Sequence, residues 1–194
     1  LDAEPTIGYI HRAFEKIADD VELWVASDGE GIEELKAKYS HDSRILWLGR
    51  ITDAEKIDRL AKCSVFCAPS LHSESFGIVV LEAMASGAPV VASSLEGYRN
   101  VATHDVNGWL IEPGDVQGLT ESLAKIIDDK QLAERLRQSG LERAKELSMR
   151  RLAEIYVEIY HKVLERESFN PDHHPKSRVV RMFSDRVLRK PQRL

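Results

Sequence analysis

Cysteine is scarce in this sequence, and long apolar runs are missing. The 194 residues include only two cysteines, Cys63 and Cys67, whose spacing fits no zinc-binding pattern. Both lie in apolar surroundings, so we interpret them as small buried side chains of a reduced, cytoplasmic protein. No run approaches the ~20 apolar residues of a membrane span, and no signal-peptide pattern follows Leu1. We therefore expect neither a disulfide framework nor a membrane span within these residues.

Acidic and basic residues are unevenly distributed along the chain. The net charge is −5, yet the residues after Glu165 include eight basic and only three acidic side chains. The remainder of the chain is therefore strongly acidic, which argues against nucleic acid as a ligand. This contrast divides the chain into a domain of residues 1–165 and a basic C-terminal tail of residues 166–194.

The tail contains a segment with the pattern of an amphipathic helix. Val179, Val180, Phe183 and Val187 fall on one helical face, roughly opposite several arginines. Three interpretations stay open for it. The tail docks on another domain, lies peripherally on an anionic membrane surface, or is disordered.

Apolar strands alternate with amphipathic helices over most of the chain. The expected strands are short apolar runs at residues 21–26, 45–48, 65–68, 90–92 and 109–111. The expected helices cover residues 8–18, 32–39, 53–61, 78–86, 116–127, 131–146 and 148–164. This alternation predicts an α/β fold with a doubly wound, Rossmann-like parallel sheet and helices on both faces. We expect the last of these helices to pack on the sheet through its apolar stripe.

The most informative stretch is H-S-E-S-F-G-I-V-V-L-E-A-M-A-S-G-A-P. A predicted strand leads into it, so the following helix begins at the carboxyl edge of the sheet, where open α/β sheets bind ligands. Backbone N–H groups near Phe76, Gly77 and Ile78 are suited to phosphate oxygens. Glu74 and Glu82 flank this point, and carboxylates accept hydrogen bonds from paired hydroxyls. Two carboxylates beside a phosphate site suggest a ligand with diols on both sides of a phosphate, as in a nucleotide sugar. The alternative is that both carboxylates only face solvent.

The segment E-S-F-G-I-V-V-L-E-A-M-A-S-G-A-P-V-V-A resembles the donor-site motif of the family 4 retaining glycosyltransferases of the GT-B fold, especially the phosphatidylinositol mannosyltransferases. The likeness extends from Leu1 to about Leu164. It implies two Rossmann-like domains that face each other across a cleft. This chain is then the C-terminal, donor-binding domain, and the N-terminal, acceptor-binding domain is missing from it. The reaction implied is transfer of mannose from GDP-mannose to a lipid or glycan hydroxyl with retention of configuration.

Two alternatives stay open beside this interpretation. One is a UDP- or ADP-sugar transferase of the same fold, and the other is a non-catalytic module that binds a nucleotide sugar. For the transferase we expect the chain alone to be incomplete and inactive. The family does not use an Asp-x-Asp metal clamp, so we expect no metal and no cofactor besides the nucleotide-sugar substrate.

The resemblance also implies roles for the residues of the motif. Glu74 is the candidate catalytic residue, which holds the sugar hydroxyls near the anomeric carbon, and Glu82 holds the ribose diol. The resemblance places Ile7 where the family normally has a phosphate-binding lysine, and the family's phosphate-binding arginine falls before Leu1. Whether these differences weaken donor binding stays open. The backbone that holds the diphosphate comes from Ser75, Phe76, Gly77, Ile78 and Val79.

A second segment falls on the positions that hold the guanine base in the mannosyltransferases. Ile51, Asp53 and Lys56 are the matching residues. Asp53 is suited to accept from the guanine N1–H and amino group, and Lys56 to donate to O6. The residues alone also allow a structural interpretation, in which Thr52 or Asp53 caps the helix that runs to Ala61 and Lys56 lies on a solvated helix face.

Overall fold

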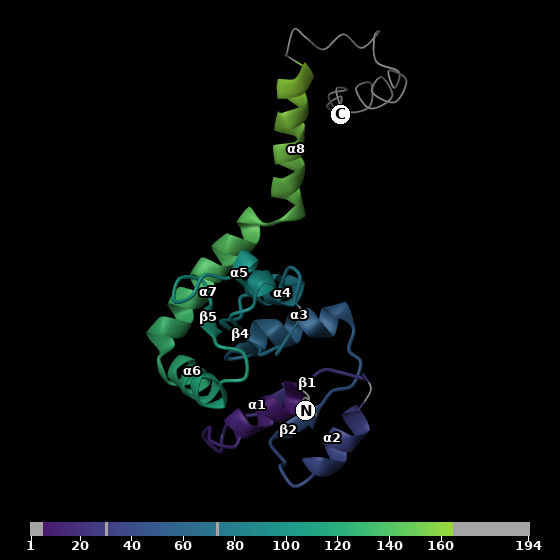
Figure 1. The fold of residues 1–194 in the computed structure, drawn as a ribbon, viewed down its shortest axis with the longest axis vertical. Coiled ribbons are helices and arrows are strands. Elements are labelled where there is room, and N and C mark those ends of the chain that lie inside the picture. Colours follow the sequence, from purple (N-terminus) through teal and green to yellow (C-terminus); the bar gives the residue numbers. More distant parts are fainter. Residues whose placement is uncertain (1–5, 30, 73, 165–194) are drawn as a thin grey trace. The chain divides into compact units, whose positions relative to one another are not determined.

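Residues 6–29, 31–72 and 74–164 are described by the computed structural model, and they divide into two compact units (Figure 1). The strands of the first unit are β1 (Leu23–Val25), β2 (Ile45–Trp47), β3 (Phe66–Ala68), β4 (Val90–Ser93) and β5 (Trp109–Ile111). Its helices are α1 (Thr6–Phe14), α2 (Ile32–Lys38), α3 (Asp53–Lys62), α4 (Ile78–Ala85), α5 (Glu96–Val101), α6 (Val116–Asp128) and α7 (Lys130–Glu146). The first unit ends at Ser148, and the second contains α8 (Met149–Leu164).

All described strand pairs are parallel, as the alternation of strands and helices predicts. β1 pairs with β2 and places Leu23 opposite Ile45. A second ladder has the order β3-β4-β5, in which Val91 lies between Cys67 and Trp109. The predicted α/β class is therefore confirmed, although the hydrogen-bonded strands form two ladders where we predicted one sheet.

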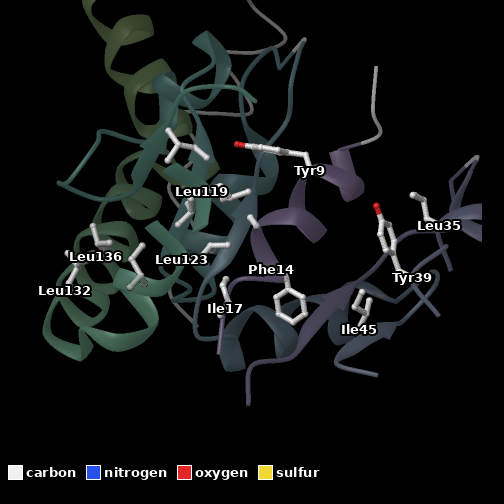
Figure 2. Packing of buried hydrophobic residues seen from close by; sticks show 14 residues of the cluster. Tyr9, Phe14, Ile17, Leu35, Tyr39, Ile45, Leu119, Leu123, Leu132 and Leu136 are labelled. Atoms are coloured by element: carbon white, nitrogen blue, oxygen red, sulfur yellow. The ribbon is translucent and has the colours of Figure 1, made fainter. Parts of the chain in front are cut away.

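Strand β4 is buried along its whole length and separates two apolar clusters. Val91 belongs to the first cluster, whereas Val90 and Ala92 belong to the second, because successive side chains of a strand point to opposite faces. The first cluster takes side chains from α1, α6 and the start of α7 (Figure 2). The second takes side chains from α4, α5 and the end of α7. Helices therefore cover both faces of the sheet, as predicted.

Helix α4 is held between the β3-β4-β5 ladder, α3 and α7. Val80, Ala83 and Met84 are fully buried. Gly140 of α7 permits this close approach, because a Cβ there would lie 3.3 Å from Cγ of Met84. The helix begins after Gly77, whose φ of 91° favours glycine. Packing on these sides leaves the first turn of α4 as its accessible end.

Helix α8 is amphipathic, and none of its residues is buried. Its apolar side chains, among them Leu152, Ile155 and Ile159, are exposed, and the predicted packing of this helix on the sheet stays a prediction. The predicted boundary after residue 165 and the predicted helix in the tail lie outside the described residues and stay predictions. Among the helices that the structure describes, none is long and apolar enough to cross a membrane.

Truncation of Leu119 tests the first apolar cluster. Leu119→Ala is expected to lower the free energy of unfolding by about 2–5 kcal/mol, because this side chain is fully buried and its removal leaves a cavity. Val106→Ala is the control, since Val106 is 53% exposed, and it should change the free energy by less than about 0.5 kcal/mol. Urea denaturation measures both variants, and equal losses would contradict the placement of Leu119 in the core.

Candidate functional site

The first turn of α4 presents backbone amide groups just beyond the carboxyl end of β3. Gly77 is the N-cap residue, and it has no side chain with which to cap the helix. The amides of Phe76 and Gly77 donate instead to Oε1 of Glu74, at 3.2 and 2.9 Å. An anion is favoured here by the helix dipole and by N–H groups that have no partner within the helix. In this structure the Glu74 carboxylate is bound by two of the amides that we predicted to hold phosphate.

The loop that carries Glu74 rests directly on the first turn of α5. A Cβ at Gly97 would collide with the backbone carbonyl of Glu74, so glycine is required for this approach. Tyr98 is 2% exposed, and its hydroxyl lies 2.9 Å from Oγ of Ser70. A Cβ at Gly77 would lie 3.0 Å from Cδ1 of Tyr98, so the tyrosine ring packs against this glycine. Burial is the main cause that raises the pKa of Tyr98. Ser70 and Tyr98 are absent from the predicted site residues, because their contact joins segments 28 positions apart and no sequence pattern relates them.

Glu82 lies on the second turn of α4 and forms an ion pair with α3. Its Oε1 accepts a hydrogen bond from Nζ of Lys56 at 2.9 Å, and the same Nζ lies 3.3 Å from Oδ1 of Asp53. The hydrogen bond to Glu82 is the main cause that raises the pKa of Lys56. The structure therefore brings Glu82, which is predicted to bind ribose, together with Lys56 and Asp53, which are predicted to bind the base.

Thr52, and not Asp53, caps helix α3. The Thr52 hydroxyl accepts from the Glu55 backbone amide at 3.2 Å, and the Glu55 side chain accepts from the Thr52 amide at 2.8 Å, which completes a capping box. The hydrogen bond from the Thr52 backbone is the main cause that lowers the pKa of Glu55. The Asp53 side chain is 92% exposed, so it is available to a ligand, and Ile51 beside the cap is partly buried.

Most of the residues whose backbone is predicted to hold the diphosphate have exposed side chains. Phe76, Ile78 and Val79 expose 39%, 58% and 37% of their area, and Ser75 is also exposed, whereas Gly77 is buried. Neighbouring apolar side chains at an accessible helix end are typical of an interaction surface. The candidate site is therefore an open surface of the first unit.

Two shallow hollows lie elsewhere in the described chain. One of about 470 Å³ follows β4 and β5 and includes Arg99 and His104, and another of about 420 Å³ follows β1 and includes Asp28. Neither contains Glu74 or Glu82. If cavity volume were the only criterion, the site would be assigned to one of these hollows. We place it at α4 instead, because this region has directed backbone amides, the carboxylates of Glu74 and Glu82, and the ammonium group of Lys56.

Within the described residues, no three His, Cys, Asp or Glu side chains are grouped so that they could hold a metal ion. Cys63 and Cys67 are free, and burial raises their pKa to about 11 and about 12, so both thiols stay protonated at neutral pH. The side chain of Ile7 lies outside the described part, so its effect on phosphate binding stays a prediction.

The chain is similar to known proteins in both sequence and fold. The sequence profile described as "Glycosyl transferases group 1" matches residues 4–143. The chain is 34% identical over 146 residues to the phosphatidyl-myo-inositol mannosyltransferase of Mycobacterium leprae (strain TN). That match covers 75% of this chain and 39% of the mannosyltransferase.

Two solved structures have a similar fold. Anabaena Alr3699/HepE in complex with UDP-glucose has a TM-score of 0.66 and 27% identity, over 72% of this chain and 40% of that chain. Sucrose-phosphate synthase (tll1590) from Thermosynechococcus elongatus has a TM-score of 0.71 and 26% identity, over 82% of this chain and 42% of that chain. The chain thus spans roughly two fifths of the length of the proteins it resembles. With the fold of one half of a GT-B glycosyltransferase, it belongs to the family of group 1 glycosyl transferases.

Proposed function

We propose that this chain binds the donor of a retaining hexosyltransferase that moves mannose from GDP-mannose to a lipid or glycan hydroxyl. The observation that carries the proposal is the pair of carboxylates, Glu74 and Glu82, on either side of the accessible first turn of α4. A nucleotide sugar presents a diphosphate between two sets of hydroxyls, and this arrangement complements it. The similarity to a mannosyltransferase supports the choice of sugar and base.

Donor binding exchanges one acceptor for another at α4. The diphosphate takes the amides of Phe76 and Gly77 that Glu74 holds in the structure, since phosphate oxygens are strong acceptors at a helix N-terminus. Glu74 is thereby released and accepts hydrogen bonds from the hexose hydroxyls beside the anomeric carbon. The backbone of Ser75, Ile78 and Val79 completes the diphosphate site.

The transfer step follows a front-face route. The acceptor oxygen bonds to the anomeric carbon on the face that the diphosphate leaves, and the acceptor proton passes to the departing phosphate oxygen. Retention through a covalent glycosyl-enzyme, as in retaining glycosidases, would need a carboxylate nucleophile, and we assign none. The α4 amides stabilise the negative charge that develops on the leaving diphosphate.

The base lies at the N-terminus of α3. Asp53 accepts from the guanine N1–H and amino group, Lys56 donates to O6, and Ile51 offers apolar contact. The capping box supports this assignment. Because Thr52 caps the helix, the Asp53 carboxylate is not needed for capping. Adenine lacks both N1–H and O6 and would leave a carboxylate unpaired.

One alternative is a UDP-sugar transferase of the same fold, which the similarity to the Anabaena structure with UDP-glucose favours. A non-catalytic nucleotide-sugar module is the other alternative. Both alternatives use the same site at α4. The UDP-sugar transferase differs from our proposal in the base of its donor, and the non-catalytic module differs in having no turnover.

Substitution of the two carboxylates should separate their roles. Glu82→Ala should weaken GDP and GDP-mannose alike, by roughly 1.5–3 kcal/mol for each charge-assisted hydrogen bond lost. Glu74→Ala should leave GDP affinity unchanged or raise it, because the competing acceptor is gone, and in the full-length enzyme it should abolish turnover. Calorimetric titration measures both, with the exposed Glu121→Ala as control. Equal effects of the two substitutions on both ligands would refute the roles assigned.

Base preference tests the guanine assignment. The chain should bind GDP about tenfold or more tightly than UDP or ADP, which is the factor expected when guanine makes one more hydrogen bond to the protein than the other bases. Asp53→Ala should erase this preference and leave UDP affinity nearly unchanged. Thr52→Ala is the matched control, since it should lower stability by about 1 kcal/mol through loss of the cap and keep the base ranking. Competition titrations decide, and a preference of the unmodified chain for UDP would favour the UDP-sugar alternative.

Transfer by the chain alone is not expected. Positioning of the acceptor and exclusion of water need a second wall opposite α4, which we propose the acceptor-binding domain supplies. Incubation of the chain with GDP-mannose and a lipid acceptor, followed by mass spectrometry of the lipid, should show donor binding without mannosylated product. Robust product formation would contradict the proposed division between donor and acceptor domains.

A further inference from the structure

The ammonium group of Lys56 lies between two carboxylates on different helices. Nζ is 2.9 Å from Oε1 of Glu82 on α4 and 3.3 Å from Oδ1 of Asp53 on its own helix, α3. Its pair with Glu82 spans 26 positions in the sequence. The pair of Lys62 and Asp58, by contrast, is an ordinary i,i+4 contact on the surface of α3. Lys56 therefore connects two helices, whereas Lys62 does not.

Glu82 needs such a partner to serve as a ribose ligand. Its side chain is 40% exposed, and a long surface side chain of this kind samples several rotamers. The bond from Lys56 holds Oε1, which leaves Oε2 and the remaining lone pair of Oε1 for hydroxyl donors. Pre-orientation of this kind reduces the entropy that ligand binding loses.

Charge gives a second reason for the lysine. The Glu82 carboxylate stands on the helix whose first turn is the proposed diphosphate site, so two negative groups come close when a nucleotide binds. A lysine at hydrogen-bonding distance offsets the carboxylate charge and reduces that repulsion.

We propose that Lys56 is a positioning residue for Glu82, which it holds ready for the ribose diol, so that base and ribose recognition are coupled through Lys56 and Glu82. The inference rests on the proposed function, because it assumes that a nucleoside diphosphate is bound here. It goes beyond that function in one respect. Lys56 contributes to the binding of every nucleoside diphosphate, whatever its base, and not only to the binding of guanine.

The test compares ligands with and without the diol. Competition titrations of the unmodified chain and of Lys56→Met use GDP and UDP, each beside its 2′,3′-dideoxy form. The unmodified chain should prefer the ribose forms by about tenfold or more, the factor expected for one hydrogen bond. Lys56→Met should bring this ratio close to one for both bases, and it should weaken UDP as well as GDP.

Three further variants sharpen the result. Lys62→Met is the matched control on the same helix and should change no affinity. Lys56→Arg should recover part of the preference for ribose, because a guanidinium still donates to the Glu82 carboxylate. In the double variant Lys56→Met with Glu82→Gln, the two losses should not add, since both remove the same ribose contact.

Two outcomes would overturn the inference. If Lys56→Met weakens GDP but keeps UDP affinity and both ribose-to-dideoxy ratios, Lys56 reads the base alone. If it changes no affinity, Lys56 is a solvated surface residue. A different result, in which the unmodified chain binds no nucleoside diphosphate, would overturn the proposed function and the inference with it.

Discussion

The burial of α4 is the constraint on which the site depends. The helix is enclosed by the β3-β4-β5 ladder, by α3 and by α7, and a glycine at position 140 lets α7 approach it closely. A helix fixed in this way holds its N-terminus at the carboxyl edge of the sheet, so in our proposal only the Glu74 carboxylate has to move when a ligand takes the amides. Preorganised amides of this kind stabilise charge without reorganisation at the moment of reaction.

The electrostatics of the site follow from that constraint. The first turn of α4 attracts an anion, and in this structure the Glu74 carboxylate fills that role. A second carboxylate, Glu82, is offset by Lys56 from the neighbouring helix. In our proposal two acidic residues can therefore serve an anionic ligand, because Glu74 moves aside for the phosphate and the charge of Glu82 is balanced by Lys56. Glu74 and Glu82 are the same residue type, yet the fold gives them different partners and, in our proposal, different tasks.

Much of the fold could be predicted from the sequence because the strands are short apolar runs that alternate with helical periodicity. β4 and α4 are found where P-V-V-A and I-V-V-L-E-A-M-A place them. One feature could not be predicted. The interruption between the β1-β2 and β3-β4-β5 ladders depends on hydrogen bonds between distant segments, which the local pattern of the sequence does not specify.

The candidate site was predictable in its composition and less so in its contacts. Glu74, Glu82, Asp53 and Lys56 are readable as ligand-binding residue types in the sequence, but the Lys56–Glu82 pair joins helices 26 positions apart, and helical periodicity carries no information on such a register. The sequence also could not decide whether Thr52 or Asp53 caps α3, because threonine and aspartate both cap helices well, whereas the structure shows that Thr52 does.

Our central claim is that the first turn of α4 is the diphosphate site. Titration of the isotope-labelled chain with GDP, followed by amide resonances in ¹H–¹⁵N NMR spectra, tests it most directly. The account predicts that the largest shifts occur at the amides of Phe76, Gly77 and Ile78, with further shifts around Lys56. Shifts confined to the hollow that contains Arg99, with α4 unchanged, would contradict it.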